Sequence, residues 1–522
     1  MTRHPHRNNL PEAICYDLSF NGRRIGTSWA VASSEGPREV TLTCFQWMAE
    51  VPTIGLQGFR KRSVYRLSRK GLLLEATIED SNGGTVHIKV SRNGLTINGR
   101  RRVLDHPVDF VLEPNQFSLV ALQLALRGRF SEHRAHAMIP DTGTTLPVTL
   151  TCKGDVIRSS FNESMTIGPD GLISSVAFAS PESAVHRAQR PIPRWTTPLC
   201  KKALAYSPPD DISVRDVEIV RSDYDAGATV ARPKAPSNPM AVALFVGGTG
   251  IYNRHGLTSR MDIGTHYLLD GLARCGVASV RYDKFNRQAA TIADAQEFQD
   301  FHSLCHDTNR WLNWLDSQTW AQNLPRIIIG HSLGGLIALS QSAARDDLRA
   351  VVTLNTPGRS LRSVTDEQHA WFQTHLAVTP PTKLEATRKR QALLGALEQD
   401  DAWTEETVPG DLLALKNQRR LLKSLLDLDP ANLVHQGTAP LLVIQGERDM
   451  QVTMKDARLL LSAADEAGRP AKLIKAAGLD HHLKRNNEKG MAAFRKYMDR
   501  RRRIPRDLIQ TIAKEIKSAV SG

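Results

Sequence analysis

The segment from Arg326 to Ala338 constrains the fold of this chain more than any other stretch. Its β-branched run Ile327–Ile329 predicts a buried strand, and the small and aliphatic residues from Leu333 onward predict a helix. Between them lies Gly330-His331-Ser332-Leu333-Gly334, in which the two outer glycines leave room for a sharp turn that lifts a serine hydroxyl clear of a sheet. We therefore predict that Ser332 is a nucleophile and that the amide of Leu333 donates to a developing oxyanion.

The sequence after residue 200 alternates apolar strand candidates with helical ones, which predicts an α/β unit with a mostly parallel sheet covered on both faces. The stretch 360–437 fits no single strand or helix, and its Leu, Lys, Arg and Glu predict a helical lid insertion over the carboxyl edge of the sheet. The predicted strands are Ala241–Val246, Ala278–Tyr282, Arg326–Ile329, Val351–Leu354 and Leu441–Ile444, and the predicted helices are Tyr267–Cys275, Ala293–Leu315, Leu336–Ala344 and Ala457–Ala467.

A serine nucleophile needs a base and an orienting acid, which in strand-to-helix elbows of this kind follow in the order Ser, Asp or Glu, His. Asp449 stands in a turn after the strand Leu441–Ile444, and His481 stands on a loop after the apolar run Ala471–Lys475. A lone aspartate after a strand is usually a turn residue or helix cap, and a lone loop histidine is usually only exposed. Here Ser332, Asp449 and His481 each follow a predicted strand, and they occur in the expected order. Together these three matches outweigh the alternative that Asp449 and His481 are ordinary turn and surface residues.

The second oxyanion donor is expected in the glycine-rich turn Gly247-Gly248-Thr249-Gly250, and we assign it to the amide of Thr249. Taken alone, this turn is also compatible with a phosphate loop. It lacks the Gly-Lys-Ser/Thr ending and does not complete Gly-x-Gly-x-x-Gly, so nucleotide binding is not favoured.

No cofactor or metal is expected. His302 and His306 stand four residues apart on a predicted helix, but the glutamate of the zinc pattern His-Glu-x-x-His is absent. We expect the two histidines to lie on a half-exposed packing face.

Residues from about 214 to the C-terminus resemble bacterial α/β-hydrolases related to serine esterases, lysophospholipase-like enzymes and prolyl-oligopeptidase-like peptidases. The resemblance rests on the glycine-rich turn with Asn253-Arg254 after it, on Arg281-Tyr282-Asp283-Lys284, and on the segments Leu354–Arg359, Asp427–Ala431, Gln445–Val452 and Gly478–Lys484. It implies a Ser332–His481–Asp449 triad and a pocket that includes Gly248, Arg254, Asp283 and His331.

In the resembling loops the base stands three residues after a glycine, which implies His481 rather than the adjacent His482. Two departures stand beside the expected pocket: Asn253 replaces the usual Asp, and Phe285-Asn286-Arg287 replaces the usual Arg-Gly-x-Gly. They imply a substrate preference different from that of a typical relative.

The resemblance favours hydrolysis of a carboxylic ester or related acyl compound through an acyl-enzyme. A prolyl-oligopeptidase-like peptidase is the alternative, although residues 1–200 lack the blade repeats that usually precede such a catalytic domain. A non-catalytic binding protein of the same fold is a further alternative, although such proteins usually lose a triad member and none is missing here.

Residues 1–195 predict a separate β-rich accessory domain, and the proline-rich Arg190–Pro198 is the expected linker to a catalytic domain at 205–522. Turn signals between short apolar runs predict antiparallel hairpins arranged as a meander, a sandwich or a curved half-barrel. These signals are Asn21-Gly22, Asn82-Gly83-Gly84, Asn93-Gly94 and Pro169-Asp170-Gly171, and one helix is predicted at Phe117–Arg127.

The formal net charge of +14 raises the question of anionic partners. The basic clusters Arg100–Arg102 and Arg500–Arg503 are short and no nucleic-acid motif accompanies them, so we expect solvated faces, with weak association with an anionic surface as the alternative. Six scattered cysteines, no signal peptide and no membrane-length apolar run predict a cytoplasmic protein. A small-molecule acyl substrate is the expected partner, and no residue pattern indicates the oligomeric state.

Overall fold

The computed structural model describes residues 10–521 except 35–37, 52–57, 82–84, 92–93, 105, 129, 196–198, 200–203, 251, 259–260, 285–298, 400–402, 404–407, 409, 427 and 498. The predicted turns at Asn82–Gly84 and Asn93, the end of the linker, the Phe285–Arg287 departure, Asp427 and the first residues of the helix predicted from Ala293 lie outside these described residues. The chain forms two compact units, the first made of residues up to 203 together with Leu376–Arg419, and the second of most of the remainder.

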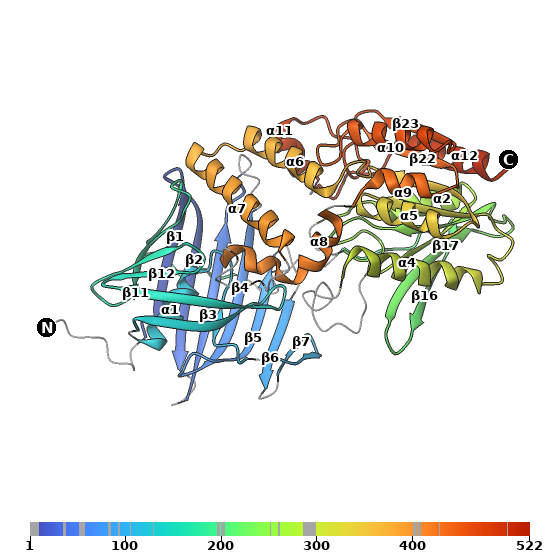
Figure 1. The fold of residues 1–522 in the computed structure, drawn as a ribbon. Helices are drawn as coiled ribbons and strands as arrows, with labels where there is room; N and C mark the ends of the chain where they lie inside the picture. Colours follow the sequence, from blue (N-terminus) through green and yellow to red (C-terminus); the bar gives the residue numbers. More distant parts are fainter. Residues whose placement is uncertain are drawn as a thin grey trace. The chain divides into compact units, whose positions relative to one another are not determined.

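The first unit is built on one fifteen-stranded sheet (Figure 1). Strands β1 to β8 follow one another across it, β1 pairs antiparallel with β15, and β14 to β9 continue on the other side. The strands are β1 Ala13–Phe20, β2 Arg23–Ser34, β3 Glu39–Met48, β4 Phe59–Ser68, β5 Leu73–Asp80, β6 Thr85–Ser91, β7 Gly94–Ile97, β8 Arg100–Arg102, β9 Phe110–Val111, β10 Glu132–Ile139, β11 Thr144–Lys153, β12 Val156–Ser159, β13 Ser164–Ile167, β14 Ile173–Ala177 and β15 Ser183–Arg187.

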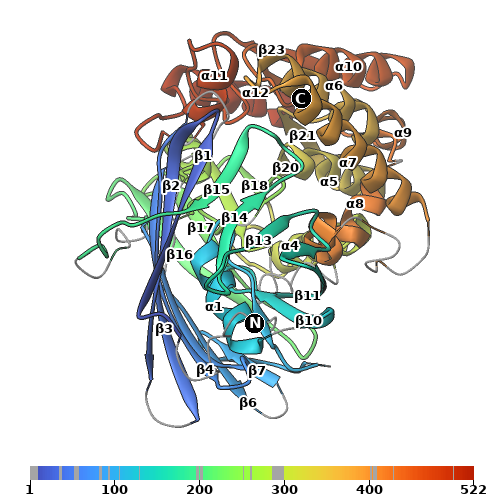
Figure 2. The same cartoon turned by 90° about the vertical axis from the view of Figure 1, so that its left-hand side faces the viewer.

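Short turns explain this arrangement, as the sequence predicts. Asn21 and Gly22 join β1 to β2 with φ angles of 49° and 73°, the left-handed values that a two-residue hairpin requires. The helix α1 (Phe117–Arg127) has the predicted bounds and packs against β1, β2, β3 and β9. Figure 2 shows the sheet curving around this helix. Alternating burial along β4, with Ser63, Tyr65 and Leu67 inside, places one sheet face toward that core.

Helices from the middle of the chain complete the first unit. α7 (Pro380–Glu398) and the 3₁₀ helix η2 (Gly410–Gln418) group with it. Glu182 accepts hydrogen bonds from the amide of Thr379 and the hydroxyl of Thr382, at the start of α7. The stretch 360–437, predicted as one insertion, is therefore divided: α6 (Leu361–His375), most of α8 (Arg419–Leu426) and α9 (Pro430–Gln436) group with the second unit.

The second unit contains an eight-stranded sheet in the order β16-β17-β19-β18-β20-β21-β22-β23. β17 runs antiparallel to both of its neighbours, and the strands from β19 to β23 are parallel, which confirms the predicted α/β architecture. The strands are β16 Ile212–Val220, β17 Asp225–Pro233, β18 Ala241–Val246, β19 Val277–Tyr282, β20 Arg326–His331, β21 Leu348–Leu354, β22 Leu441–Gly446 and β23 Ala471–Ala476.

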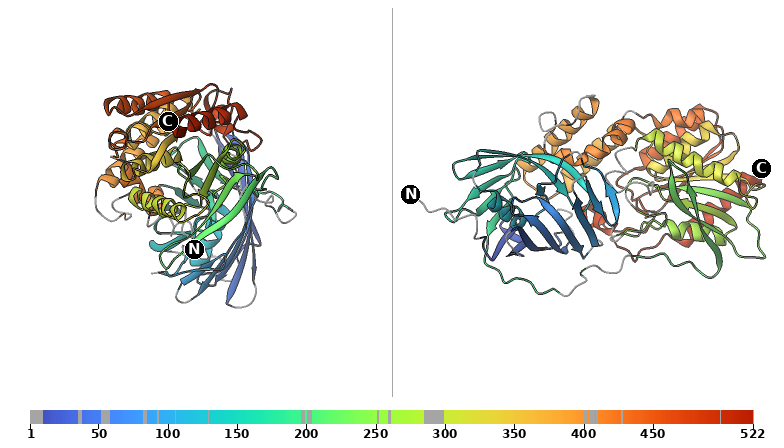
Figure 3. Two further views of the ribbon diagram at one scale, coloured as in Figure 1. Left: turned by 90° about the vertical axis from the view of Figure 1, so that its right-hand side faces the viewer. Right: turned by 90° about the horizontal axis from the view of Figure 1, so that it is seen from below.

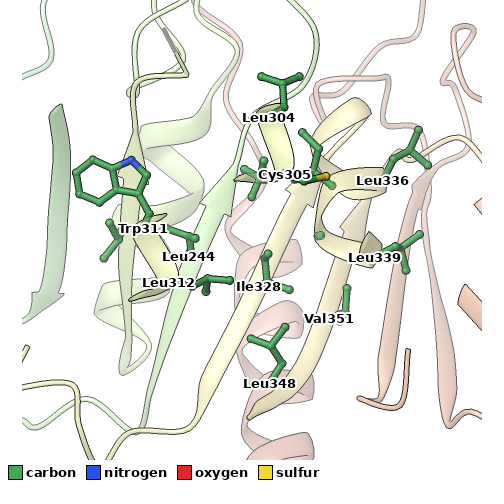
Figure 4. Packing of buried hydrophobic residues seen from close by; sticks show 14 of the residues in the cluster. Leu244, Leu304, Cys305, Trp311, Leu312, Ile328, Leu336, Leu339, Leu348 and Val351 are labelled. Atoms are coloured by element: carbon green, nitrogen blue, oxygen red, sulfur yellow. The ribbon is translucent and has the colours of Figure 1, made fainter. Parts of the chain in front are cut away.

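Helices cover both faces of this sheet (Figure 3). In β18, Val242 and Leu244 face one hydrophobic core, which α4, α5, α9 and α10 complete, whereas Ala243 and Phe245 face the other, which α2 and α12 complete. Figure 4 shows part of the first core, where Trp311 and Leu312 of α4 pack near Leu244. The remaining helices of the unit are α2 Thr265–Arg274, α4 Phe301–Asp316, α5 Leu333–Ala344, α10 Met454–Glu466, α11 Gly490–Lys496 and α12 Arg506–Ser521.

Two further findings concern the helices. Asp300 and Ser303 form a capping box that begins α4 at Phe301, later than the predicted Ala293. Among the described residues, none of the helices has both the length and the apolar character that a membrane span requires.

Candidate active site

Ser332 occupies a sharp turn between β20 and α5. Its φ of 53° and ψ of −120° lie outside the regions that non-glycine residues normally adopt, so the surrounding backbone must hold this strained conformation. The neighbouring glycines are required by space, because a Cβ on Gly330 would collide with the carbonyl oxygen of Gly334, and one on Gly334 would collide with that of Val246. The local sequence thus produces the predicted strand–turn–helix elbow.

Asp449 and His481 form a buried pair after β22 and β23. The His481 Nδ1 and Asp449 Oδ2 atoms are 2.7 Å apart, and the exposed fractions of the two side chains are 6% and 0%. The second carboxylate oxygen of Asp449 accepts the amides of Gln451 (2.8 Å) and Val452 (3.0 Å). A carboxylate held in this way favours the imidazole tautomer with the proton on Nδ1, which leaves Nε2 as a base.

The loop that carries His481 is fixed through its backbone. The Asn355 amide group donates to the carbonyl oxygens of Asp480 (3.0 Å) and His481 (2.9 Å), and its side-chain oxygen accepts the Gly446 amide (2.7 Å). The His331 Nε2 atom lies 2.7 Å from the same His481 carbonyl, and burial followed by the neighbouring His481 charge lowers the pKa of His331 to about 3. His331 is therefore a neutral donor that ties the strand before Ser332 to the loop that carries His481.

An ion pair braces this loop from its other side. Asp480 contacts Arg502 through both terminal guanidinium nitrogens, and the exposed side-chain fractions are 0% and 9%. His482 packs against Tyr497, with ring centroids 5.1 Å apart, and burial lowers its pKa well below the usual range. The two adjacent histidines thus have different surroundings, and the contact with Asp449 belongs to His481.

Ser332, His481 and His482 line one cavity of about 460 Å³ within the second unit, together with Gly248, Thr249, Leu333 and His331. Most of its other lining side chains are apolar, and the polar ones include Arg359, Gln368 and Gln451. The apolar and aromatic lining comes from Tyr252, Met261, Ile263, Leu336, Pro357, Leu361, Val364, Leu425, Leu428, Val452, Phe494 and Tyr497.

Two predicted pocket residues lie elsewhere. Arg254 pairs with Asp283 (Nη1 to Oδ2, 2.7 Å) and its Nε donates to Thr229 (3.0 Å), and neither Arg254 nor Asp283 is among the described residues that line the cavity. Asn253, which departs from the resembling sequences, accepts the amides of His255 and Leu257 through its side-chain oxygen and so closes a turn.

The region of His302 and His306 carries no sign of a metal centre. Both side chains are exposed on α4, and no cluster of three metal-ligating side chains is found in the part of the chain that the structure describes.

Sequence reasoning missed the roles of Asn355 and Arg502. Asn355 directly follows the parallel strand β21, so the rule that carboxyl ends of parallel strands meet at one edge signals its place. Arg502 lies in a basic cluster that the sequence assigned to solvent, and its buried partner Asp480 was visible only as a neighbour of His481.

Comparison with known proteins shows what the second unit resembles. A family model described as serine aminopeptidase, S33, matches residues 251–488, which contain the elbow, Asp449 and His481. The second unit has the α/β-hydrolase fold. Esterase EstD of Thermotoga maritima is 29% identical to the chain over 134 residues, which make up 26% of this chain and 29% of that protein. The chain thus spans less than a third of the length of this relative.

Solved structures that resemble the chain include Est1E from Butyrivibrio proteoclasticus, with 15% identity, a TM-score of 0.36, and coverage of 59% of this chain and 99% of that chain. The Pyrococcus furiosus esterase Pf2001 has 13% identity, a TM-score of 0.39, and coverage of 61% and 96%.

Proposed function

We propose that the α/β-hydrolase unit cleaves carboxylic esters with an apolar acyl group through an acyl-enzyme on Ser332. One observation carries the proposal: His481, paired with the buried Asp449, and the strained Ser332 line the same mostly apolar cavity. The similarity to Esterase EstD supports the same reaction class.

The reaction proceeds in two acyl transfers. His481 Nε2 takes the proton of the Ser332 hydroxyl as Oγ attacks the ester carbonyl carbon, and the oxyanion is bound by the amides of Thr249 and Leu333. His481 then returns the proton to the leaving alcohol oxygen. Water then attacks the acyl carbon as His481 takes its proton, and His481 passes that proton to Ser332 Oγ as the bond to the acyl group breaks and the carboxylic acid leaves.

The cavity favours a neutral acyl group. Arg359 is the lining residue with a permanent charge, and Asp456 engages it through its Nε (2.9 Å) and one Nη (2.8 Å), while Glu367 engages the other Nη. Apolar side chains line most of the remaining described surface, so burial of an acyl chain gains the hydrophobic stabilisation of about 25 cal/mol per Å².

An aminopeptidase is the second candidate, because that activity is named in the description of the matching family model. An aminopeptidase must bind a substrate ammonium group, for which a carboxylate is the natural partner. No Asp or Glu occurs among the described residues that line the cavity. This supports an ester substrate over a peptide with a free amino terminus.

Labelling with a fluorophosphonate probe, followed by hydrolysis assays, tests the proposal. Ser332→Ala should abolish labelling and lower kcat by about a millionfold while the fold persists. p-Nitrophenyl esters of graded chain length should be cleaved faster than leucine p-nitroanilide. Substantial ester hydrolysis by folded Ser332→Ala protein contradicts the triad, absence of labelling favours a binding protein, and faster cleavage of the anilide favours the aminopeptidase.

A further inference from the structure

Two side chains, the buried Lys284 and the partly buried Tyr252 of the cavity lining, converge on one backbone carbonyl beside Ser332. The Tyr252 hydroxyl donates to the Gly248 oxygen at 2.8 Å, and the Lys284 Nζ atom donates to the same oxygen. The Lys284 nitrogen also lies 5.3 Å from the centroid of the Tyr252 ring. The chemistry of the triad described above uses neither side chain.

The carbonyl belongs to the peptide that carries the Thr249 amide. A trans peptide directs its C=O and N–H to opposite sides, so donors that hold the Gly248 oxygen on one side also fix the direction of the Thr249 N–H on the other. This peptide adjoins the nucleophile, because a Cβ on Gly248 would lie 3.0 Å from the Ser332 Cβ. No hydrogen-bond acceptor for the Thr249 amide is found among the described residues.

From this arrangement we infer that Lys284 and Tyr252 are positioning residues that hold the Gly248–Thr249 peptide with its N–H directed at the substrate oxyanion. The inference rests on the proposed function, since it assigns these residues to the oxyanion site of the same reaction.

A buried lysine without a carboxylate partner is uncommon in proteins, and the role of holding the Gly248 carbonyl accounts for Lys284 at this position. Lys284 is 8% exposed, and among the described residues no carboxylate pairs with it. Burial lowers the pKa of Lys284 to about 7, and transfer of an ammonium from water into a protein interior is costly without a compensating partner. An ammonium on the Gly248 oxygen polarises the peptide and makes the Thr249 N–H a stronger donor.

The loops that carry the two residues are themselves cross-linked. Arg254, two residues after Tyr252, binds the carboxylate of Asp283, which directly precedes Lys284, through its backbone amide (3.0 Å) and its guanidinium (2.7 Å). Arg254 and Asp283 were predicted to line the pocket. Their contact instead holds together the two chain segments that carry Tyr252 and Lys284.

The test is kinetic and uses the full-length protein. Loss of an oxyanion donor lowers kcat by about 10²–10³, so Lys284→Met should lower kcat about 10–100-fold, with KM changed less than about twofold. Tyr252→Phe should give a smaller loss in kcat, and the double variant should lose less than the product of the two. Affinity for a trifluoromethyl ketone, which mimics the tetrahedral adduct, should fall in parallel with kcat.

Two matched controls separate positioning from general damage. Tyr224→Phe removes a buried hydroxyl that accepts from Trp311 Nε1 (2.9 Å), and Lys472→Met removes a charge paired with Glu515 (2.7 Å). Both should keep the parental kcat. If Lys284→Met fails to fold, Tyr252→Phe and its ketone affinity still decide the question.

Unchanged kcat and ketone affinity in the folded variants, or a rise in KM alone, would overturn this assignment while Ser332-dependent hydrolysis remains intact. Loss of the proposed function is recognised separately, because it appears as ester hydrolysis that persists in Ser332→Ala.

Discussion

Asn355→Ala tests how the base loop is held. The side chain is fully buried and bonds three backbone groups from two segments, the carbonyls of Asp480 and His481 and the amide of Gly446. Its removal leaves the Gly446 amide without its Asn355 acceptor, whereas the Asp480 carbonyl keeps the amide of Leu483 (2.8 Å) and the His481 carbonyl keeps its contact with His331.

The expected cost follows from that inventory. An unsatisfied buried backbone group costs about 1–3 kcal/mol, so the loss of the Gly446 contact should lower the free energy of unfolding by about that amount. At roughly 2–4 °C per kcal/mol, the thermal midpoint of the hydrolase unit should fall by about 2–12 °C. Displacement of a catalytic group by about 1 Å costs on the order of 100-fold in rate, so kcat should also fall at temperatures where the variant is folded.

Thermal unfolding followed by tryptophan fluorescence, together with ester kinetics well below the midpoint, measures both effects. Asn313→Ala is the matched control, because Asn313 is exposed on α4 and accepts only at the surface from Arg345 (2.8 Å). A midpoint and kcat for Asn355→Ala that equal those of Asn313→Ala would refute the reasoning.

Three further predictions follow from other contacts. His481→Ala should remove ester hydrolysis whereas His482→Ala should keep most of it, because only His481 contacts Asp449; inactivity of the His482 variant alone would reverse the assignment of the base. Asp449→Asn should keep the fold but lower kcat by about 10⁴, since an amide at this place favours the wrong imidazole tautomer, and the kcat of the purified variant decides it. Burial acts to raise the pKa of Glu182, but hydrogen bonds from Thr379 and Thr382 outweigh it and lower the pKa from 4.5 to about 2. The ionised form is therefore stabilised in the folded state, the docking of α7 should weaken as pH falls from about 4.5 toward 2, and Glu182→Gln should weaken it at neutral pH; unchanged amide-exchange protection of α7 would contradict both expectations.

The sequence predicted the hydrolase sheet because its signals are local. The β-branched run before Gly330 and the glycines beyond it determine the strand, the turn and the helix within a dozen residues. β16 and β17 were not predicted. Most residues of β16 are exposed at the edge of the sheet, and β17 has the small residues Ala226, Gly227 and Ala228 near its start rather than a β-branched run. The capping box of Asp300 and Ser303 was present in the sequence, but periodicity alone placed the helix start too early.

Contacts between distant segments were beyond sequence reasoning. The order of Ser332, Asp449 and His481 was predicted from motifs, yet the residues that hold them in place depend on pairings across the fold. Asn355 acts on a loop about 125 residues away, and Lys284 acts on a carbonyl 36 residues before it. Likewise, nothing in the local sequence of α7 shows that its start contacts Glu182, about 200 residues earlier.

The divided composition of the first unit has a consequence for biosynthesis. Its two stretches, which end at Ala203 and begin again at Leu376, are separated by about 170 residues that belong mostly to the hydrolase unit. At a translation rate of about 5–20 residues per second, roughly 10–35 seconds pass between the synthesis of the two stretches. The strands of the first unit are therefore synthesised well before α7, and the segment that contains Ser332 is made in between. Because each unit is built from separate stretches of the chain, no single truncation point can give both units complete.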